Sequence, residues 1–172
     1  MTRTTNARIA GFTFLFYIAA GLGSMALARN APAAALLPLL TSFSAIVLGV
    51  TLYAITREQD QDLAMLALVC RVIEGGSTRG GSIFFAVASL LFAWLFLRGR
   101  MIPVALARLG IFASALLVGF LPLQLAGMFG GPDSWQSPVT WVMWMPMLVF
   151  EVTLALWLLI KGAAAPASRQ TS

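Results

Sequence analysis

The feature that most constrains the fold is the stretch of residues 9–28, which contains no charged residue. A helix of about 20 residues, rising 1.5 Å per residue, crosses the roughly 30 Å hydrocarbon core of a bilayer. Charged residues make up only 10% of the 172-residue chain, against about 25% in soluble domains, while 60% of the residues are hydrophobic. The polar side chains are too few to cover a soluble globule, so we expect the lipid bilayer to surround this protein.

Apolar stretches of this kind recur along the chain, separated by short polar breaks. Inside lipid, only helices or a closed barrel satisfy every backbone polar group, and these stretches lack the alternation that is typical of barrel strands. The sequence therefore predicts an all-α fold, a polytopic helical bundle that forms a single transmembrane domain over residues 1–172. Its six transmembrane helices are expected at residues 9–28, 36–56, 63–76, 82–97, 103–129 and 139–160. Residues 163–172 are expected to form a disordered cytoplasmic tail.

Two alternatives to six full crossings remain open. As helices, segments 63–76 and 82–97 would be only about 21 Å and 24 Å long, shorter than the membrane core. A glycine-rich break at residues 75–82 joins them, so they form either two short crossings or a re-entrant pair. The first segment follows Arg3 and Arg8 and also fits a signal peptide, whose cleavage would leave five helices.

The arginine and lysine residues that flank the predicted helices indicate the orientation of the chain, because such residues concentrate in cytoplasmic loops. With six crossings and a cytoplasmic N-terminus, the inner side holds Arg3, Arg8, Arg57, Arg98, Arg100, Lys161 and Arg169, and the outer side holds Arg29 and Arg79. We therefore expect a multi-pass protein of a bacterial plasma (inner) membrane with both termini in the cytoplasm. The same topology explains the net charge of +5, so nucleic-acid binding is not expected.

The composition also excludes several classes of active site. The chain has no histidine and one cysteine, Cys70, which leaves too few ligands for zinc, haem or an iron–sulfur cluster. Ser-His and Cys-His nucleophile pairs are excluded for the same reason. The glycine-rich break lacks the spacing of a phosphate-binding loop. We therefore expect no catalytic residue, no metal site and no cofactor, and an enzyme is the least supported function.

Polar residues inside the predicted helices are the candidates for a functional site, because a charge at mid-helix costs about 2.5–3.5 kcal/mol on insertion scales. Arg71 and Glu74 are three residues apart and share a helix face. Counting residues from the helix ends places Glu74 and Glu151 at a similar depth, about 15–18 Å from the surfaces. We therefore expect Glu151 to lie within hydrogen-bonding reach of Arg71 or Glu74. Gln124, close to Pro122, is a further candidate for lining a cavity.

The cluster of two acids and one base has two interpretations. In the first, the surplus carboxyl binds a proton or forms the polar end of a pocket, as in a small carrier or intramembrane binding protein for an apolar or protonated solute. In the second, the charges form a packing knot that fixes helix register in a structural or accessory membrane protein. The partners expected are the lipid bilayer and, in the first case, a small apolar ligand.

Several short motifs together resemble one known family. They are Ala7-Arg8-Ile9-Ala10-Gly11, Arg71-Val72-Ile73-Glu74, Arg100-Met101-Ile102-Pro103 and the closing residues from Glu151 to Gly162. In this order they resemble the bacterial multi-pass membrane family known as domain of unknown function 4386. This chain differs in being shorter between the arginine–glutamate motif and the following helix. The resemblance implies a six-helix bacterial inner-membrane protein and no known activity.

Overall fold

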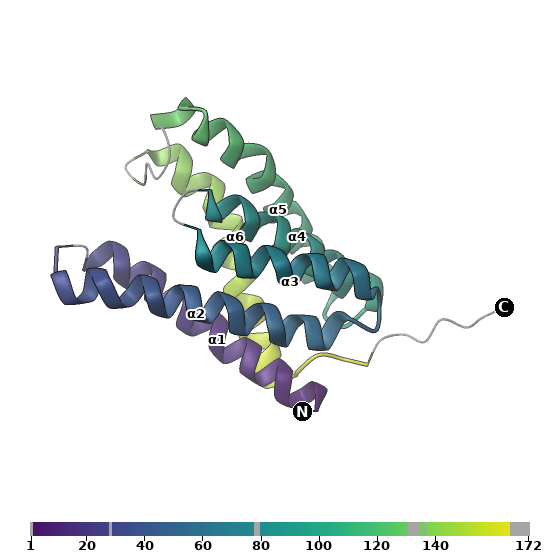
Figure 1. The fold of residues 1–172 in the computed structure, drawn as a ribbon. Helices are drawn as coiled ribbons and strands as arrows, with labels where there is room; N and C mark the ends of the chain where they lie inside the picture. The colour runs from purple at the N-terminus through teal and green to yellow at the C-terminus, as the bar shows by residue number, and fades with distance from the viewer. Residues whose placement is uncertain (1, 28, 78–79, 131–134, 136, 166–172) are drawn as a thin grey trace.

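The computed structural model describes residues 2–27, 29–77, 80–130, 135 and 137–165. These residues form six α-helices and one short 3₁₀ helix, which Figure 1 shows as a bundle. The elements are α1 (Arg3–Ala26), α2 (Ala31–Thr56), α3 (Gln61–Gly76), α4 (Gly81–Gly99), α5 (Val104–Leu125), η1 (Met128–Gly130) and α6 (Pro138–Ile160). The predicted all-α fold is confirmed over the described residues.

Five of these helices, all except α3, are long and apolar enough to cross a membrane. α3 has 16 residues and is about 24 Å long. Both α3 and α4 were expected to be short. α4 has 19 residues, three more than predicted, so α3 is the shorter of the two. α5 ends at Leu125 and not at residue 129, because Gly127 and Phe129 adopt positive φ angles of 94° and 57°. The chain is thus a helical membrane protein with one short helix.

Both ends of the described chain lie at one end of the bundle, which we call the termini end. The Arg3 guanidinium donates to Glu58 Oε2 at 2.6 Å and to the carbonyl oxygen of Ala164 at 3.2 Å. The backbone N–H of Ala164 donates to the carbonyl of Met101 at 3.0 Å. The contacts hold the first residues after α6 against the α4–α5 connection. The rest of the predicted disordered tail, residues 166–172, lies outside the described residues, as does Arg79.

The short helix α3 stops partway along α2. A Cβ atom on Gly75, near the end of α3, would lie 2.9 Å from the carbonyl oxygen of Ser42. Residues 31–41 of α2 therefore extend beyond the end of α3 by about 16 Å of helix. In Figure 1, the α1–α2 pair and the α5–α6 pair diverge away from the termini end, with α3 and α4 between them. The far half of the bundle is consequently more open than the half near the termini.

Glycines mark the closest helix contacts. A Cβ atom on Gly11 of α1 would lie 2.7 Å from the carbonyl oxygen of Ala155 in α6. A Cβ atom on Gly110 of α5 would lie 2.5 Å from the Phe150 ring in α6 and 3.0 Å from Ala93 in α4. Such approach is typical of membrane helices, which gain association energy from close packing and not from burial away from water. These glycines hold α6 against α1 and α5.

We expect Gly110→Ala to lower the free energy of unfolding by about 1–3 kcal/mol, because the added methyl group overpacks the α4–α5–α6 contact. Unfolding can be measured in mixed detergent micelles. Gly119→Ala in the same helix is the control, since a Cβ there meets no atom within 4 Å. Combining Gly110→Ala with Phe150→Leu should restore part of the loss. Equal stability of the Gly110 and Gly119 variants would contradict the close contact.

Candidate functional site

Arg71 is the centre of the buried polar cluster and contacts four helices besides its own. Its side chain is 1% exposed. A Cβ atom on Gly49 of α2 would lie only 2.9 Å from the Cβ atom of Arg71. The glycine therefore leaves room for the aliphatic part of the arginine side chain. The Arg71 Nη2 atom donates to Ser89 Oγ of α4 at 3.3 Å. The contacts with α1 and α6, and further contacts with α3 and α4, are described next.

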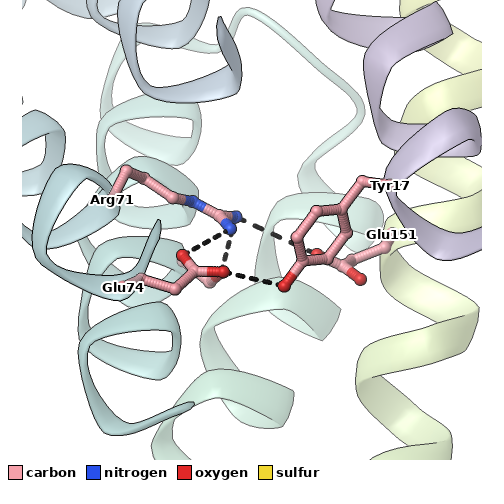
Figure 2. Close-up of polar contacts among 5 residues, drawn as sticks. Tyr17, Arg71, Glu74 and Glu151 are labelled. Atoms are coloured by element: carbon pink, nitrogen blue, oxygen red, sulfur yellow. Dashed lines mark hydrogen bonds and ion pairs between the residues drawn. The ribbon is translucent and has the colours of Figure 1, made fainter. Parts of the chain in front are cut away.

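Glu74 is the close counter-ion of Arg71. The Arg71 Nη1 atom donates to Glu74 Oε2 at 3.0 Å, and the two residues are one helical turn apart on α3 as predicted. The Tyr17 hydroxyl of α1 donates to Glu74 Oε1 at 2.7 Å (Figure 2). The Glu74 side chain is 8% exposed. Both carboxylate oxygens of Glu74 therefore have a hydrogen-bond partner.

Glu151 reaches the same cluster from α6 but has a different environment. Its Oε1 atom lies 3.9 Å from Arg71 Nη2, which makes an ion pair without a hydrogen bond. Glu74 and Glu151 thus both reach Arg71, whereas the prediction that Glu151 lies within hydrogen-bonding reach is wrong. The reason is that Arg71 directs its Nη atoms to Glu74 and Ser89, on α3 and α4. Glu151 Oε1 is buried and has no hydrogen-bond partner among the described residues.

Aromatic rings surround the Arg71 guanidinium. Its Cζ atom lies 4.8 Å from the centroid of the Phe85 ring and 5.9 Å from the centroids of Phe14 and Tyr17. Phe85 also stacks on Tyr17 at 6.3 Å and on Trp144 of α6 at 5.6 Å. Ring faces attract a cation electrostatically. The buried guanidinium is thus stabilised by both a carboxylate and a set of ring faces.

An apolar pocket of about 140 Å³ lies between α1 and α6. We define the apolar pocket by Gly21, Leu22 and Met25 of α1, Trp141, Trp144 and Met145 of α6, and the adjacent Trp135. Tyr17 and Glu151 also line it. Helices α1 and α6 run antiparallel, and their close approach at Gly11 lies toward the termini end. Tyr17 and Glu151 therefore form the end of the pocket that is nearest the termini. The pocket therefore extends along both helices down to the buried carboxylate.

A second, more polar pocket of about 370 Å³ lies where α3 stops short of α2. We define the polar pocket by Ser24, Thr41, Ser42, Ser77 and Ser82 together with Glu74. Tyr17 and Trp144 line both pockets, so these two side chains stand between them. The two pockets thus reach the same charge cluster from two sides, the polar one at Glu74 and the apolar one at Glu151.

Comparison with known proteins identifies the family. Residues 77–162, half of the chain, match the family model described as "Domain of unknown function (DUF4386)". The chain belongs to the DUF4386 family. The match includes Glu151 and the α6 wall of the apolar pocket, whereas Tyr17, Arg71 and Glu74 precede the matched residues. No curated protein and no solved structure matches the chain.

Gln124 lies apart from the charge cluster of this DUF4386 protein. It is buried near the end of α5, and its Nε2 atom donates to Thr140 Oγ1 at 3.1 Å. Thr140 precedes Glu151 by eleven residues on α6, or about 16 Å of helix. The structure therefore brings Arg71, Glu74 and Glu151 together, and gives Gln124 a separate contact between α5 and α6.

Three residues of the site did not emerge from the sequence of this DUF4386 protein: Tyr17, Ser89 and Trp144. Tyr17 carried a usable signal, because a tyrosine well inside a predicted span needs a partner for its hydroxyl group. Ser89 carried a weaker one, since a serine inside an apolar helix often bonds a backbone carbonyl of its own helix. Trp144 carried no signal for the site, since a tryptophan near the end of an apolar helix is typical of the membrane surface, and the structure stacks it on Phe85.

Proposed function

We propose that this protein is a small carrier or intramembrane binding protein for an apolar or protonated solute. The observation that carries the proposal is the apolar pocket between α1 and α6, which has the acidic residue Glu151 in its lining. Binding sites for small molecules are mostly apolar concavities with a few polar groups that fix orientation. An ion-pair network that only fixed helix packing would need no cavity beside it.

The position of the charge cluster also supports a binding role. Ionisable residues inside membrane helices are costly, and they commonly mark substrate or proton pathways. Here the polar pocket reaches Glu74 and the apolar pocket reaches Glu151. A solute in the apolar pocket would therefore contact a group that belongs to the same ion-pair cluster as Arg71.

A second function, that of a structural or accessory membrane protein, is favoured by the environment of Arg71. Its guanidinium is almost fully buried, is paired with Glu74 and packs against three aromatic rings. Contacts with helices α1, α2, α4 and α6 would fix the register of the bundle. This role accounts for Arg71 and Glu74, and it leaves both the apolar pocket and Glu151 unexplained.

We further infer that both termini face the cytoplasm of a bacterial plasma membrane. Reporter domains fused after residue 60 and after residue 100 should read cytoplasmic, and one fused after residue 133 should read external. The physical reason is the excess of arginine and lysine on the loops at the termini end. An external signal from the fusion after residue 60 would contradict this orientation.

The binding role can be tested by filling the apolar pocket. Gly21 lines this pocket, and a Cβ atom there would meet no atom within 4 Å, so Gly21→Leu adds a side chain without a clash. The probe is bromobenzene, a heavy-atom quencher of tryptophan fluorescence, added to the protein in lipid nanodiscs. We expect saturable quenching from Trp135, Trp141 and Trp144 in the parent protein and its loss in Gly21→Leu.

Gly119→Leu is the matched control for this experiment. Gly119 also lies in a helix, has open space around it, and does not line the apolar pocket. This variant should keep the saturable quenching. Quenching that rises only linearly with bromobenzene in all three proteins would reflect the lipid phase alone and would overturn the proposed binding site.

A further inference from the structure

The charges of the buried cluster do not balance. Arg71 contributes one positive charge, and Glu74 and Glu151 contribute one negative charge each when ionised. Among the described residues, no other salt bridge reaches these three side chains. When both carboxyl groups are ionised, the cluster lacks one positive charge, so the surplus negative charge must be neutralised by a bound proton or by a bound cation.

The imbalance is located at Glu151. Glu74 holds the nearer contact to Arg71, at 3.0 Å, and a hydrogen bond from Tyr17. Glu151 Oε1 lies 3.9 Å from Arg71 Nη2, and this nitrogen atom already donates a hydrogen bond to Ser89 Oγ. The Glu151 side chain is 6% exposed and lines the apolar pocket. The missing positive charge is thus expected where Glu151 meets this pocket.

The walls of the apolar pocket suit a cation with an apolar body. Indole and phenol rings attract a cation through their faces, and tryptophan is the most effective of the aromatic residues. Trp135, Trp141 and Trp144 line the pocket and contact one another, with ring centroids 5.4 Å apart for Trp135–Trp141 and for Trp135–Trp144. Tyr17 lines the end next to Glu151. Charge complementarity and aromatic walls therefore favour the same class of ligand.

The volume of the pocket limits the size of that ligand. About 140 Å³ is close to the cavity of roughly 150 Å³ that accommodates one benzene molecule in an engineered protein core. The pocket is therefore large enough for about one aromatic ring. A lipid acyl chain could fill the same space, but it offers no positive charge to Glu151, which would then be neutralised by a proton.

We propose that the apolar pocket binds small aromatic organic cations, with the cationic head group on the Glu151 carboxylate and the ring among Trp135, Trp141 and Trp144. This inference rests on the proposed binding function and adds the charge and the size of the solute. Glu151 is then the residue that determines specificity, while Arg71 and Glu74 hold the cluster together. The cation supplies the positive charge that the helices do not provide.

Two probes of the same shape test the inference. Phenyltrimethylammonium and tert-butylbenzene differ only in the central atom of the head group, which is a positively charged nitrogen in the first and a neutral carbon in the second. Binding of each is measured by equilibrium dialysis against the full-length protein in neutral-lipid nanodiscs, with empty nanodiscs subtracted. We expect Glu151→Gln to weaken binding of phenyltrimethylammonium about tenfold or more and to change binding of tert-butylbenzene by less than about threefold.

Two further variants make the outcome decisive. Gly21→Leu should abolish binding of both probes, and Gly119→Leu, which does not line the pocket, should leave both unchanged. Glu151→Gln is compared only if it folds, which thermal unfolding measures. If it does not fold, comparing the two probes on the parent protein and on Gly21→Leu still shows whether the pocket binds the cation. Binding of tert-butylbenzene without phenyltrimethylammonium would overturn the cation assignment and keep the binding site, whereas binding of neither would overturn both.

Discussion

Arg71→Leu should lower the free energy of unfolding by about 3–5 kcal/mol, the largest effect that we expect from a single substitution in this protein. The guanidinium is 1% exposed and holds Glu74 at 3.0 Å and Glu151 at 3.9 Å. Removing it leaves two buried carboxyl groups without their counter-charge, so that they must remain unpaired or take up protons. Unfolding in mixed micelles measures the loss.

The triple replacement Arg71→Leu, Glu74→Leu and Glu151→Leu is the control for this prediction. It removes the attraction together with the cost of burying the charges, so it should be more stable than Arg71→Leu alone. A triple variant that is less stable than the single variant would show that the ion pairs provide net stability. A triple variant that folds and still binds phenyltrimethylammonium as the parent protein does would identify the cluster as a packing knot.

Glu74→Leu should destabilise the protein much more than Glu151→Leu, although both remove one carboxylate from the same guanidinium. We expect a loss of about 3 kcal/mol or more for Glu74→Leu, because Arg71 loses its close counter-ion and the Tyr17 hydroxyl loses its acceptor. For Glu151→Leu we expect a change of less than about 1 kcal/mol. Glu151 forms no hydrogen bond, and the Arg71–Glu74 pair remains intact without it.

The same unfolding measurement compares the two glutamate variants, and Tyr17→Phe supplies a further check. It should cost less than Glu74→Leu, because it removes one hydrogen bond and leaves the ion pair with Arg71 in place. If Glu151→Leu proves as costly as Glu74→Leu, Glu151 is a structural partner of Arg71 and is not available for a ligand.

Composition and spacing were sufficient to predict the class of fold and the meeting of three charges. The apolar stretches predict helices, and the i, i+3 spacing of Arg71 and Glu74 predicts their contact. The depth of Glu151 follows from the constant rise of a helix, since a transmembrane helix leaves little freedom along its axis. Each of these inferences uses one helix at a time. The structure agrees with the helices and with the Arg71–Glu74 contact, and it places Glu151 3.9 Å from Arg71.

What the sequence did not predict depends on how helices lie against one another. The donor geometry of Arg71 follows from Ser89 and Phe85 on α4, which no local pattern places beside it. The polar pocket exists because α3 stops at the level of Ser42, a relation between two helices. Gln124 was a candidate for lining a cavity because it lies close to Pro122, and its partner proved to be Thr140 on α6.

The most direct test of the binding site is a crystal structure of the protein soaked with 4-bromophenyltrimethylammonium, in which bromine is located by its anomalous scattering. The predicted result is a bromine peak in the apolar pocket between α1 and α6, with the ammonium group against the carboxylate of Glu151. The peak should be absent from crystals of Gly21→Leu, in which the leucine fills that space. A parent structure with no bromine in the pocket, or with the ammonium group turned away from Glu151, would contradict the assignment.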